Sequence, residues 1–265
     1  MSRLLLLLLT LLVPALSQAA IETKTIDYRQ GDTRLVGYLA YPKEARGPLP
    51  GVLVVHEWKG LDDYAKRRTE QLAELGYVAF ATDIYGDGKT TTDSKEAGAL
   101  AGAYKKDRAL LRARVAAGLA TLKAQPGVAR DKIAAMGYCF GGTTVLELAR
   151  SGAEVAGVIS FHGGLDSPAP QDAKNIRAKV LVLHGADDPY VPPEQVAAFE
   201  TEMREAGVDW QLLAYGGAVH GFTNPANGSD PGKGAAYNAK ADQRSWRAMQ
   251  QFFAELFGPA VQKSP

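Results

Sequence analysis

The 265-residue chain has a single cysteine, so no disulfide can form within it. A lone thiol is a liability in an oxidising compartment unless it has a chemical task. An excess of charge of either sign is also missing, because the chain has 30 Lys and Arg and 29 Asp and Glu. Without a basic excess, nothing attracts a nucleic-acid backbone or an anionic membrane surface. We therefore expect neither as a partner.

Long apolar runs are scarce, and the most pronounced run lies near the N-terminus. One arginine precedes an almost wholly apolar stretch, residues 4–16, and small or polar residues follow. This is the layout of a secretory signal peptide, and it is too short to span a bilayer comfortably, so an uncleaved anchor is the less favoured alternative. We predict that residues 1–20 are removed after Ala19 or Ala20. Residues 21–265 would then form a periplasmic or secreted domain without stable membrane insertion.

Beyond the predicted signal peptide, apolar segments of strand type alternate with amphipathic helical segments. Such alternation predicts a single α/β domain with a mostly parallel central sheet and helices on both faces. Residues 86–99, rich in glycine, threonine and charge, are expected to be a loop or cap insertion. The predicted strands are residues 34–41, 50–56, 77–84, 132–137, 155–161, 179–184 and 209–215, and the predicted helices are 62–75, 100–124, 142–150, a segment after Pro193, and 235–257.

The lone cysteine, Cys139, lies in the sequence Gly-Tyr-Cys-Phe-Gly-Gly at residues 137–142, where a predicted strand meets a helix. This is the pattern of a nucleophile elbow, with cysteine in place of serine. The glycines permit a strained turn, and the positive N-terminal end of the helix favours a thiolate. An isolated free cysteine is most often a small buried apolar residue. The strand-turn-helix context favours a nucleophile instead.

A hydrolase of this architecture places nucleophile, acid and histidine in that chain order. Asp188 follows the predicted strand 179–184, and His220 lies in a late loop before the final helix. In such a triad the histidine exchanges protons with the thiol and the leaving group, and the acid orients the imidazole. Asp187 is the alternative acid, although it could equally cap the turn. Cys139, Asp188 and His220 are the predicted triad.

Several segments together resemble the dienelactone hydrolase family, whose members have an α/β-hydrolase fold. These segments are Val54–Leu61, Ala81–Gly86, the Cys139 elbow, Asp188-Pro-Tyr-Val-Pro and His220-Gly-Phe, and the similarity spans nearly all of residues 30–257. The resemblance implies hydrolysis of a small-molecule lactone or activated carboxylic ester, with no cofactor or metal. It also implies that Glu57 contacts the resting thiol and that the backbone N–H groups of Trp58 and Phe140 form the oxyanion hole.

The sequence departs from the family at Asn224, where an arginine typically holds the substrate carboxylate. We therefore expect weak selection for carboxylated substrates, with Lys59 as a partial substitute. If another arginine binds such a group, the candidates are Arg67, Arg68, Arg108 and Arg112. The possible substrate contacts are Lys59, Tyr85, Tyr138 and Asn224.

Several other features have simpler explanations. His56-Glu57 begins like a zinc-protease motif, but Gly60 stands where the second histidine belongs. His162 and His184 close apolar strands and are expected to be structural. Two alternatives to a lactone hydrolase stay open: a general carboxylesterase or thioesterase, and a non-catalytic binding protein on the same fold. Failure to turn over any activated ester would favour the second.

Overall fold

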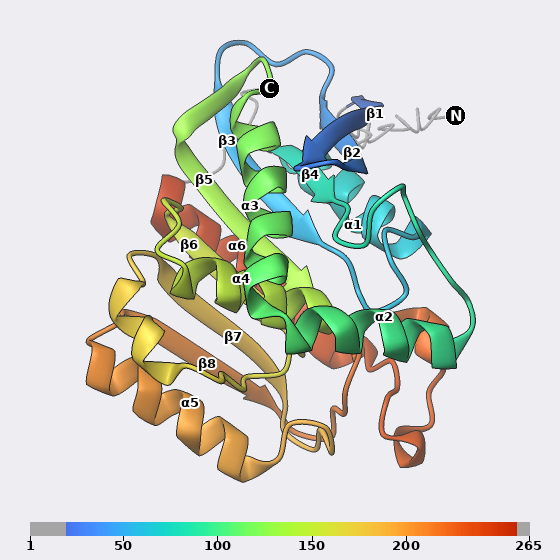
Figure 1. Cartoon of the computed structure of the whole chain (residues 1–265), viewed down its shortest axis with the longest axis vertical. Coiled ribbons are helices and arrows are strands. Elements are labelled where there is room, and N and C mark those ends of the chain that lie inside the picture. The colour runs from blue at the N-terminus through green and yellow to red at the C-terminus, as the bar shows by residue number, and fades with distance from the viewer. Residues whose placement is uncertain (1–19, 259–265) are drawn as a thin grey trace, which may run out of the picture.

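The computed structural model describes residues 20–258, so the predicted signal peptide lies almost wholly outside the described residues. An eight-stranded sheet crosses the molecule in the order β1-β2-β4-β3-β5-β6-β7-β8 (Figure 1). The strands are β1 (Ile21–Gln30), β2 (Thr33–Pro42), β3 (Leu49–Val55), β4 (Val78–Thr82), β5 (Val128–Tyr138), β6 (Gly157–Phe161), β7 (Lys179–Gly185) and β8 (Trp210–Tyr215). The six adjacent strands β4-β3-β5-β6-β7-β8 pair in parallel. Strand β2 pairs antiparallel with both of its neighbours, β1 and β4.

Helices cover both faces of the sheet. One face packs against α1 and α6, and the other packs against α2, α3, α4 and α5. The helices are α1 (Asp63–Glu74), α2 (Ser94–Lys106), α3 (Arg108–Lys123), α4 (Phe140–Arg150), α5 (Pro193–Ala206) and α6 (Ala239–Phe257), and the short 3-10 helices are η1 (Pro170–Asn175), η2 (Pro225–Asn227) and η3 (Pro231–Lys233). The predicted fold class, a mostly parallel α/β sheet in one domain, is confirmed.

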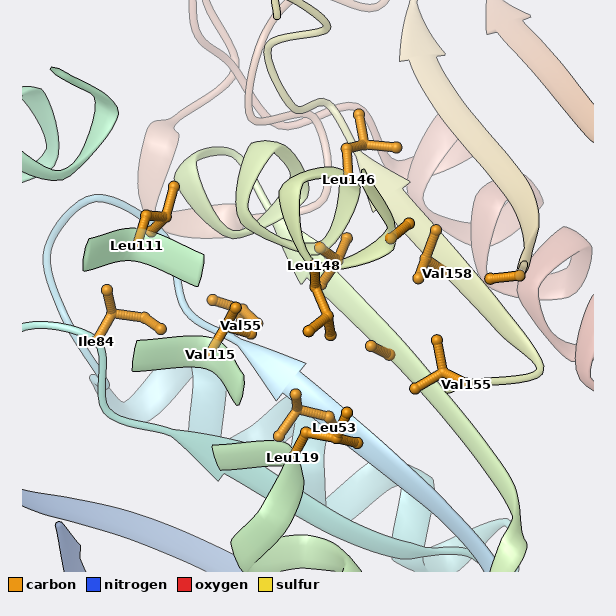
Figure 2. Packing of buried hydrophobic residues seen from close by; sticks show 14 of the residues in the cluster. Leu53, Val55, Ile84, Leu111, Val115, Leu119, Leu146, Leu148, Val155 and Val158 are labelled. Carbon is orange, nitrogen blue, oxygen red and sulfur yellow. The ribbon is translucent and has the colours of Figure 1, made fainter. Parts of the chain in front are cut away.

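The core explains why the central strands are continuously apolar rather than alternating. Figure 2 shows Val115 and Leu119 of α3 beside Leu53 and Val55 of β3. These four side chains are between 0% and 7% exposed. Burying each contributes about 1.5–3 kcal/mol of hydrophobic free energy. A parallel strand covered on both faces has no solvent side, so both sets of its side chains are apolar.

The observed secondary structure differs from the prediction in three places. Residues 21–30 form β1, which was not predicted, because an edge strand buries little and its side chains are mostly polar. The single helix predicted at 100–124 is two helices that meet at Asp107. The Asp107 carboxylate accepts the N–H of Leu110 and so caps α3, while the backbone of Asp107 ends α2. Part of the predicted loop at 86–99 accordingly belongs to α2.

The topology gathers the candidate residues at one edge of the sheet. Glu57 follows β3, Cys139 follows β5, Asp188 follows β7 and His220 follows β8. In open α/β sheets, ligands bind at the carboxyl ends of the parallel strands. Residues far apart in sequence therefore converge there. Within residues 20–258, no helix combines the length and the apolar character needed to cross a membrane.

Candidate active site

Cys139 occupies a strained turn between β5 and α4. Its backbone has φ +53° and ψ −113°, a conformation that residues with a side chain rarely adopt. The turn is possible because Gly137 has no side chain. The chain passes so close to itself here that a Cβ on Gly137 would collide with the backbone of Gly141. The Cys139 N–H points inward, toward Phe161 O at 2.9 Å and His162 Nδ1 at 3.1 Å. This turn presents the thiol at the amino end of α4.

His220 stands between the thiol and a carboxylate. Its Nε2 lies 3.0 Å from Cys139 Sγ, and its Nδ1 lies 2.8 Å from Asp188 Oδ2. The loop is fixed on its other side, because the His220 N–H donates to Gly234 O at 3.2 Å and the Ala236 N–H donates to His220 O at 3.1 Å. The structure thus brings together the three side chains that the sequence grouped as a triad.

The two neighbouring aspartates have different surroundings. Asp188 is 4% exposed, bonds His220 through Oδ2 and accepts the Tyr190 N–H through Oδ1 at 2.8 Å. Asp187 is exposed, and its carboxylate accepts the Gly217 N–H at 3.0 Å. Asp187 therefore braces the turn that precedes the histidine loop, whereas Asp188 contacts the imidazole itself.

The charge balance favours a protonated imidazole at His220. Burial by itself would lower the pKa of His220, but the adjacent Cys139 sulfur and the Asp188 carboxylate outweigh burial and raise the pKa well above its usual value. Both partners stabilise the cation, since an opposite charge within a few ångströms favours the charged form. A proton held on the imidazole is a proton available for a leaving group.

Two backbone N–H groups, one after β3 and one after β5, are candidate oxyanion donors. Phe140 is the first residue of α4 and Trp58 follows β3, and among the described residues the N–H of neither forms a turn or loop hydrogen bond. The Trp58 segment is held in place because the Tyr85 hydroxyl donates to Trp58 O at 2.8 Å and the Thr91 N–H donates to Lys59 O at 3.0 Å. Tyr85, predicted as a substrate contact, is buried and braces this loop.

Glu57 pairs with Asn224. The Asn224 amide donates from Nδ2 to Glu57 Oε2 at 2.6 Å, and both side chains are 6% exposed. Burial raises the pKa of Glu57 to about 7, although the Asn224 hydrogen bond acts in the opposite direction. Among the described residues no hydrogen bond joins Glu57 to Cys139 Sγ, which is hydrogen-bonded to His220, so the expected contact of Glu57 with the thiol stays a prediction. Asn224 is correspondingly engaged by Glu57 rather than exposed to a substrate.

Two other predicted substrate contacts differ in their surroundings. Tyr138 is 1% exposed and its ring stacks on Phe161 with centroids 4.6 Å apart, so its side chain packs in the core. Lys59 is partly exposed beside Glu57, and its charge helps to lower the pKa of that carboxyl. Lys59 stays a candidate contact.

The arginines considered as alternative carboxylate binders already have acidic partners. The pairs are Arg67 with Glu70 and Glu74, Arg68 with Asp242, Arg108 with Asp166, and Arg112 with Glu147 and Asp172. A guanidinium that is already paired would have to exchange one carboxylate for another. Each of the four charges is therefore balanced by an acid, although Nε and Nη1 of Arg108 have no hydrogen-bond partner among the described residues.

The sequence analysis missed two neighbours of the site. His162 was expected to be merely structural, yet its ring lies 5.5 Å from that of His220 and accepts the N–H of the nucleophile candidate. Tyr190 is 60% exposed, and its ring stands edge-on to His220 with centroids 5.3 Å apart. Tyr190 could have been singled out as the second residue after Asp188. No local pattern could have revealed the contact of His162 with Cys139.

Comparison with known proteins decides the family. The profile of the dienelactone hydrolase family matches residues 35–257. The chain belongs to the dienelactone hydrolase family. Its resemblance to that family in sequence is thereby confirmed, as is membership of a hydrolase family that acts on small molecules.

Named relatives match this chain over most of their length. A Synechocystis sp. protein provisionally named carboxymethylenebutenolidase is 29% identical, over 88% of this chain and 96% of its own. A Bradyrhizobium sp. protein provisionally named 2-oxo-3-(5-oxofuran-2-ylidene)propanoate lactonase is 30% identical, over 77% of this chain and 86% of its own. A solved structure titled as a dienelactone hydrolase-like promiscuous phosphotriesterase, from metagenomic libraries, is 45% identical, covers 90% of this chain and 100% of its own, and has a TM-score of 0.86.

Proposed function

We propose that this protein hydrolyses lactones or activated carboxylic esters of small molecules through a thioester formed on Cys139. The observation that carries the proposal is the continuous line from Cys139 Sγ to His220 Nε2 at 3.0 Å and from His220 Nδ1 to Asp188 Oδ2 at 2.8 Å. Such a line, starting on an elbow at the amino end of a helix, is the arrangement of nucleophile, base and orienting acid.

The reaction follows from the positions of these groups. The Cys139 thiolate attacks the carbonyl carbon, and the imidazolium of His220 donates its proton to the departing alkoxide. Water then attacks the thioester while His220 takes up one proton of that water, and the tetrahedral intermediate expels Cys139 as thiolate, which releases the acid and restores the pair of thiolate and imidazolium. Asp188 keeps the imidazole oriented and stabilises its positive charge in both steps.

The oxyanion of each tetrahedral intermediate would lie against the backbone N–H groups of Phe140 and Trp58. These donors are held before substrate arrives, one by α4 and the other by the braced loop at Trp58. Donors fixed in advance need not reorganise as charge develops, which is the usual origin of oxyanion-hole catalysis.

We further propose that neutral esters are accepted at least as well as carboxylated ones. Asn224 is bonded to Glu57, and the arginines considered above are paired with acids. A carboxylate would therefore meet Lys59 as a point charge rather than a bidentate guanidinium. It would also approach the carboxyl of Glu57, which is ionised above about pH 7 and would then repel it.

The test compares two aryl esters that differ only in one carboxylate, with wild type and Lys59→Ala. We expect the ratio of their kcat/KM values to stay within roughly tenfold, and Lys59→Ala to lower the value for the acid alone, since a bidentate clamp worth several kcal/mol is missing. A hundredfold preference for the acid that survives Lys59→Ala would contradict this specificity. Full turnover after complete alkylation of Cys139 would contradict the nucleophile.

A second candidate activity is the hydrolysis of neutral phosphotriesters. It is favoured by the 45% identity to the solved protein described as a dienelactone hydrolase-like promiscuous phosphotriesterase. A triester has no negative charge and needs no cationic clamp, which suits a site with Asn224 bonded to Glu57. An aryl dialkyl phosphate, followed through release of its phenolate, tests this activity, and Cys139→Ala is the control.

A further inference from the structure

Cys139 is in direct contact with a second backbone outlier. Among the described residues other than glycine, positive φ values occur at Asp87, Cys139 and His162. The last two are joined, because the Cys139 N–H donates to His162 Nδ1 at 3.1 Å. The His162 backbone, at φ +41°, is itself tied to β7 through its N–H, which donates to Leu183 O at 2.8 Å. Two strained turns are thus locked together beside the thiol.

The contact determines the tautomer of His162. Since Nδ1 accepts a hydrogen bond from Cys139, the proton of the neutral ring must be on Nε2. Nε2 lies 2.7 Å from the hydroxyl oxygen of Thr223 and donates to it. Burial, and after it the charge of His220, lower the pKa of His162 well below its usual value, which keeps the ring neutral.

Thr223 is itself held by groups from α1. Its hydroxyl lies 2.6 Å from the Tyr64 hydroxyl, and its carbonyl oxygen accepts Arg68 Nη2 at 2.9 Å. Arg68 Nε also donates to the Tyr64 hydroxyl at 3.1 Å, and Arg68 Nη2 bonds Asp242. The acceptor that selects the His162 tautomer is therefore fixed from two sides.

We propose that His162 is a positioning residue for the thiol nucleophile. By accepting the Cys139 N–H, its Nδ1 stabilises the strained elbow in the conformation that keeps Sγ within reach of His220 Nε2. Together with Phe161 O, which accepts the same N–H at 2.9 Å, this bond turns the Cys139 N–H away from the reacting carbonyl and leaves the oxyanion to Phe140 and Trp58. His162 touches neither substrate nor reacting atoms, and the Nε2–H bond to Thr223 keeps its acceptor unprotonated. This inference rests on the proposed function, since it concerns the same nucleophile.

Two substitutions separate the effect of the hydrogen bond on kcat from the effects of backbone strain and of the loss of the imidazole ring. Both His162→Asn and His162→Gly tolerate positive φ and remove the imidazole, but only asparagine has an oxygen near the position of Nδ1. We expect His162→Asn to keep kcat within roughly threefold of wild type and His162→Gly to lower it roughly tenfold or more, with KM nearly unchanged in both. Thermal unfolding of each variant establishes that it is folded at the assay temperature.

The other end of the chain of bonds supplies an independent test. Thr223→Val removes the acceptor of His162 Nε2 at nearly constant volume, so the ring is free to carry its proton on Nδ1, facing the Cys139 N–H. Thr223→Ser keeps the acceptor and is the matched control. We expect Thr223→Val, and not Thr223→Ser, to lower kcat by roughly threefold to tenfold. In the His162→Asn background, which has no tautomer to select, Thr223→Val should have little further effect.

Alkylation of Cys139 by iodoacetamide gives a readout that needs no ester turnover. The second-order rate constants should rank wild type and His162→Asn above His162→Gly and Thr223→Val. If the four proteins are alkylated in this order but wild type hydrolyses no ester, the proposed function fails and the positioning role stands. Equal kcat and equal alkylation rates in His162→Asn and His162→Gly would overturn the positioning role. So would an undiminished effect of Thr223→Val in the His162→Asn background.

Discussion

Asn224 donates a hydrogen bond to Glu57 across 167 positions of sequence, with 2.6 Å between Nδ2 and Oε2. The pair buries a carboxyl at the carboxyl end of β3 and partners it with a neutral amide in place of a cation. A guanidinium at this position would hold the glutamate ionised. With asparagine there, burial is the larger influence, and the pKa of Glu57 rises to about 7.

The first prediction concerns stability and pH. The pKa of Glu57 rises from 4.5 to about 7 on folding, so the folded protein binds a proton that the unfolded chain has lost between these values. The free energy of unfolding should therefore fall as pH rises from about 4.5 to 7, by at most about 3 kcal/mol from this group. Glu57→Gln keeps the hydrogen-bond acceptor and removes the titration.

Urea denaturation of wild type and Glu57→Gln at pH 5 and pH 8 provides the measurement. Relative to the variant, wild type should be less stable at pH 8 than at pH 5. A difference between the two proteins that is the same at both pH values would show that Glu57 does not titrate in this window.

The second prediction distinguishes the neighbouring aspartates. Asp188→Asn should lower kcat by orders of magnitude, because a misoriented imidazole is a poor base; the corresponding change in a serine protease costs about ten-thousandfold. In Asp187→Asn the amide oxygen can still accept the Gly217 N–H, so kcat should stay within the same order of magnitude. Steady-state kinetics on one activated ester checks both, and the reverse ranking would move the acid role to Asp187.

The third prediction concerns a buried ion cluster away from the site. Arg150 is fully buried, and its Nε and Nη2 bond both carboxylate oxygens of Glu202 at 2.7 and 2.8 Å, while Nη1 bonds Glu147 at 3.0 Å. Arg150→Met would leave the buried Glu202 carboxylate without a cation, while Glu147 keeps its pair with Arg112, at a cost of about 3–5 kcal/mol of unfolding free energy.

The control is Arg177→Met, which breaks a pair between side chains that are 71% and 77% exposed. It should cost less than about 1 kcal/mol, because exposed pairs contribute little. Equal losses in the two variants, measured by urea denaturation, would mean that burial of the Arg150 cluster is unimportant.

The fourth prediction concerns export and lies outside the described residues. Residues 1–20 fused to a reporter should carry it out of the bacterial cytoplasm, with cleavage after Ala19 or Ala20. N-terminal sequencing of the exported reporter identifies the site. A mature protein that still begins at Met1 in its own host would refute the prediction.

Much of the architecture follows from the sequence because its determinants are local. Continuous apolar runs between amphipathic segments dictate buried parallel strands with helices on both faces. The glycines around Cys139 dictate an elbow, because the backbone approaches itself too closely there for any Cβ. Chain order and position at strand ends then place Asp188 and His220 at the same edge of the sheet. These inferences require no knowledge of side-chain contacts.

Tertiary structure alone decided what each polar group contacts. It placed Tyr138 in the core, stacked on Phe161 of the neighbouring strand β6, although the next residue, Cys139, is at the turn. It joined His162 to Cys139 and to Thr223, residues separated by 23 and 61 positions from it. Such pairings depend on where loops fold over the sheet edge, and no periodicity encodes them. The reactive group of the site can therefore be identified from its neighbours in sequence. The hydrogen bonds that position it join residues far apart in sequence and are known only from the structure.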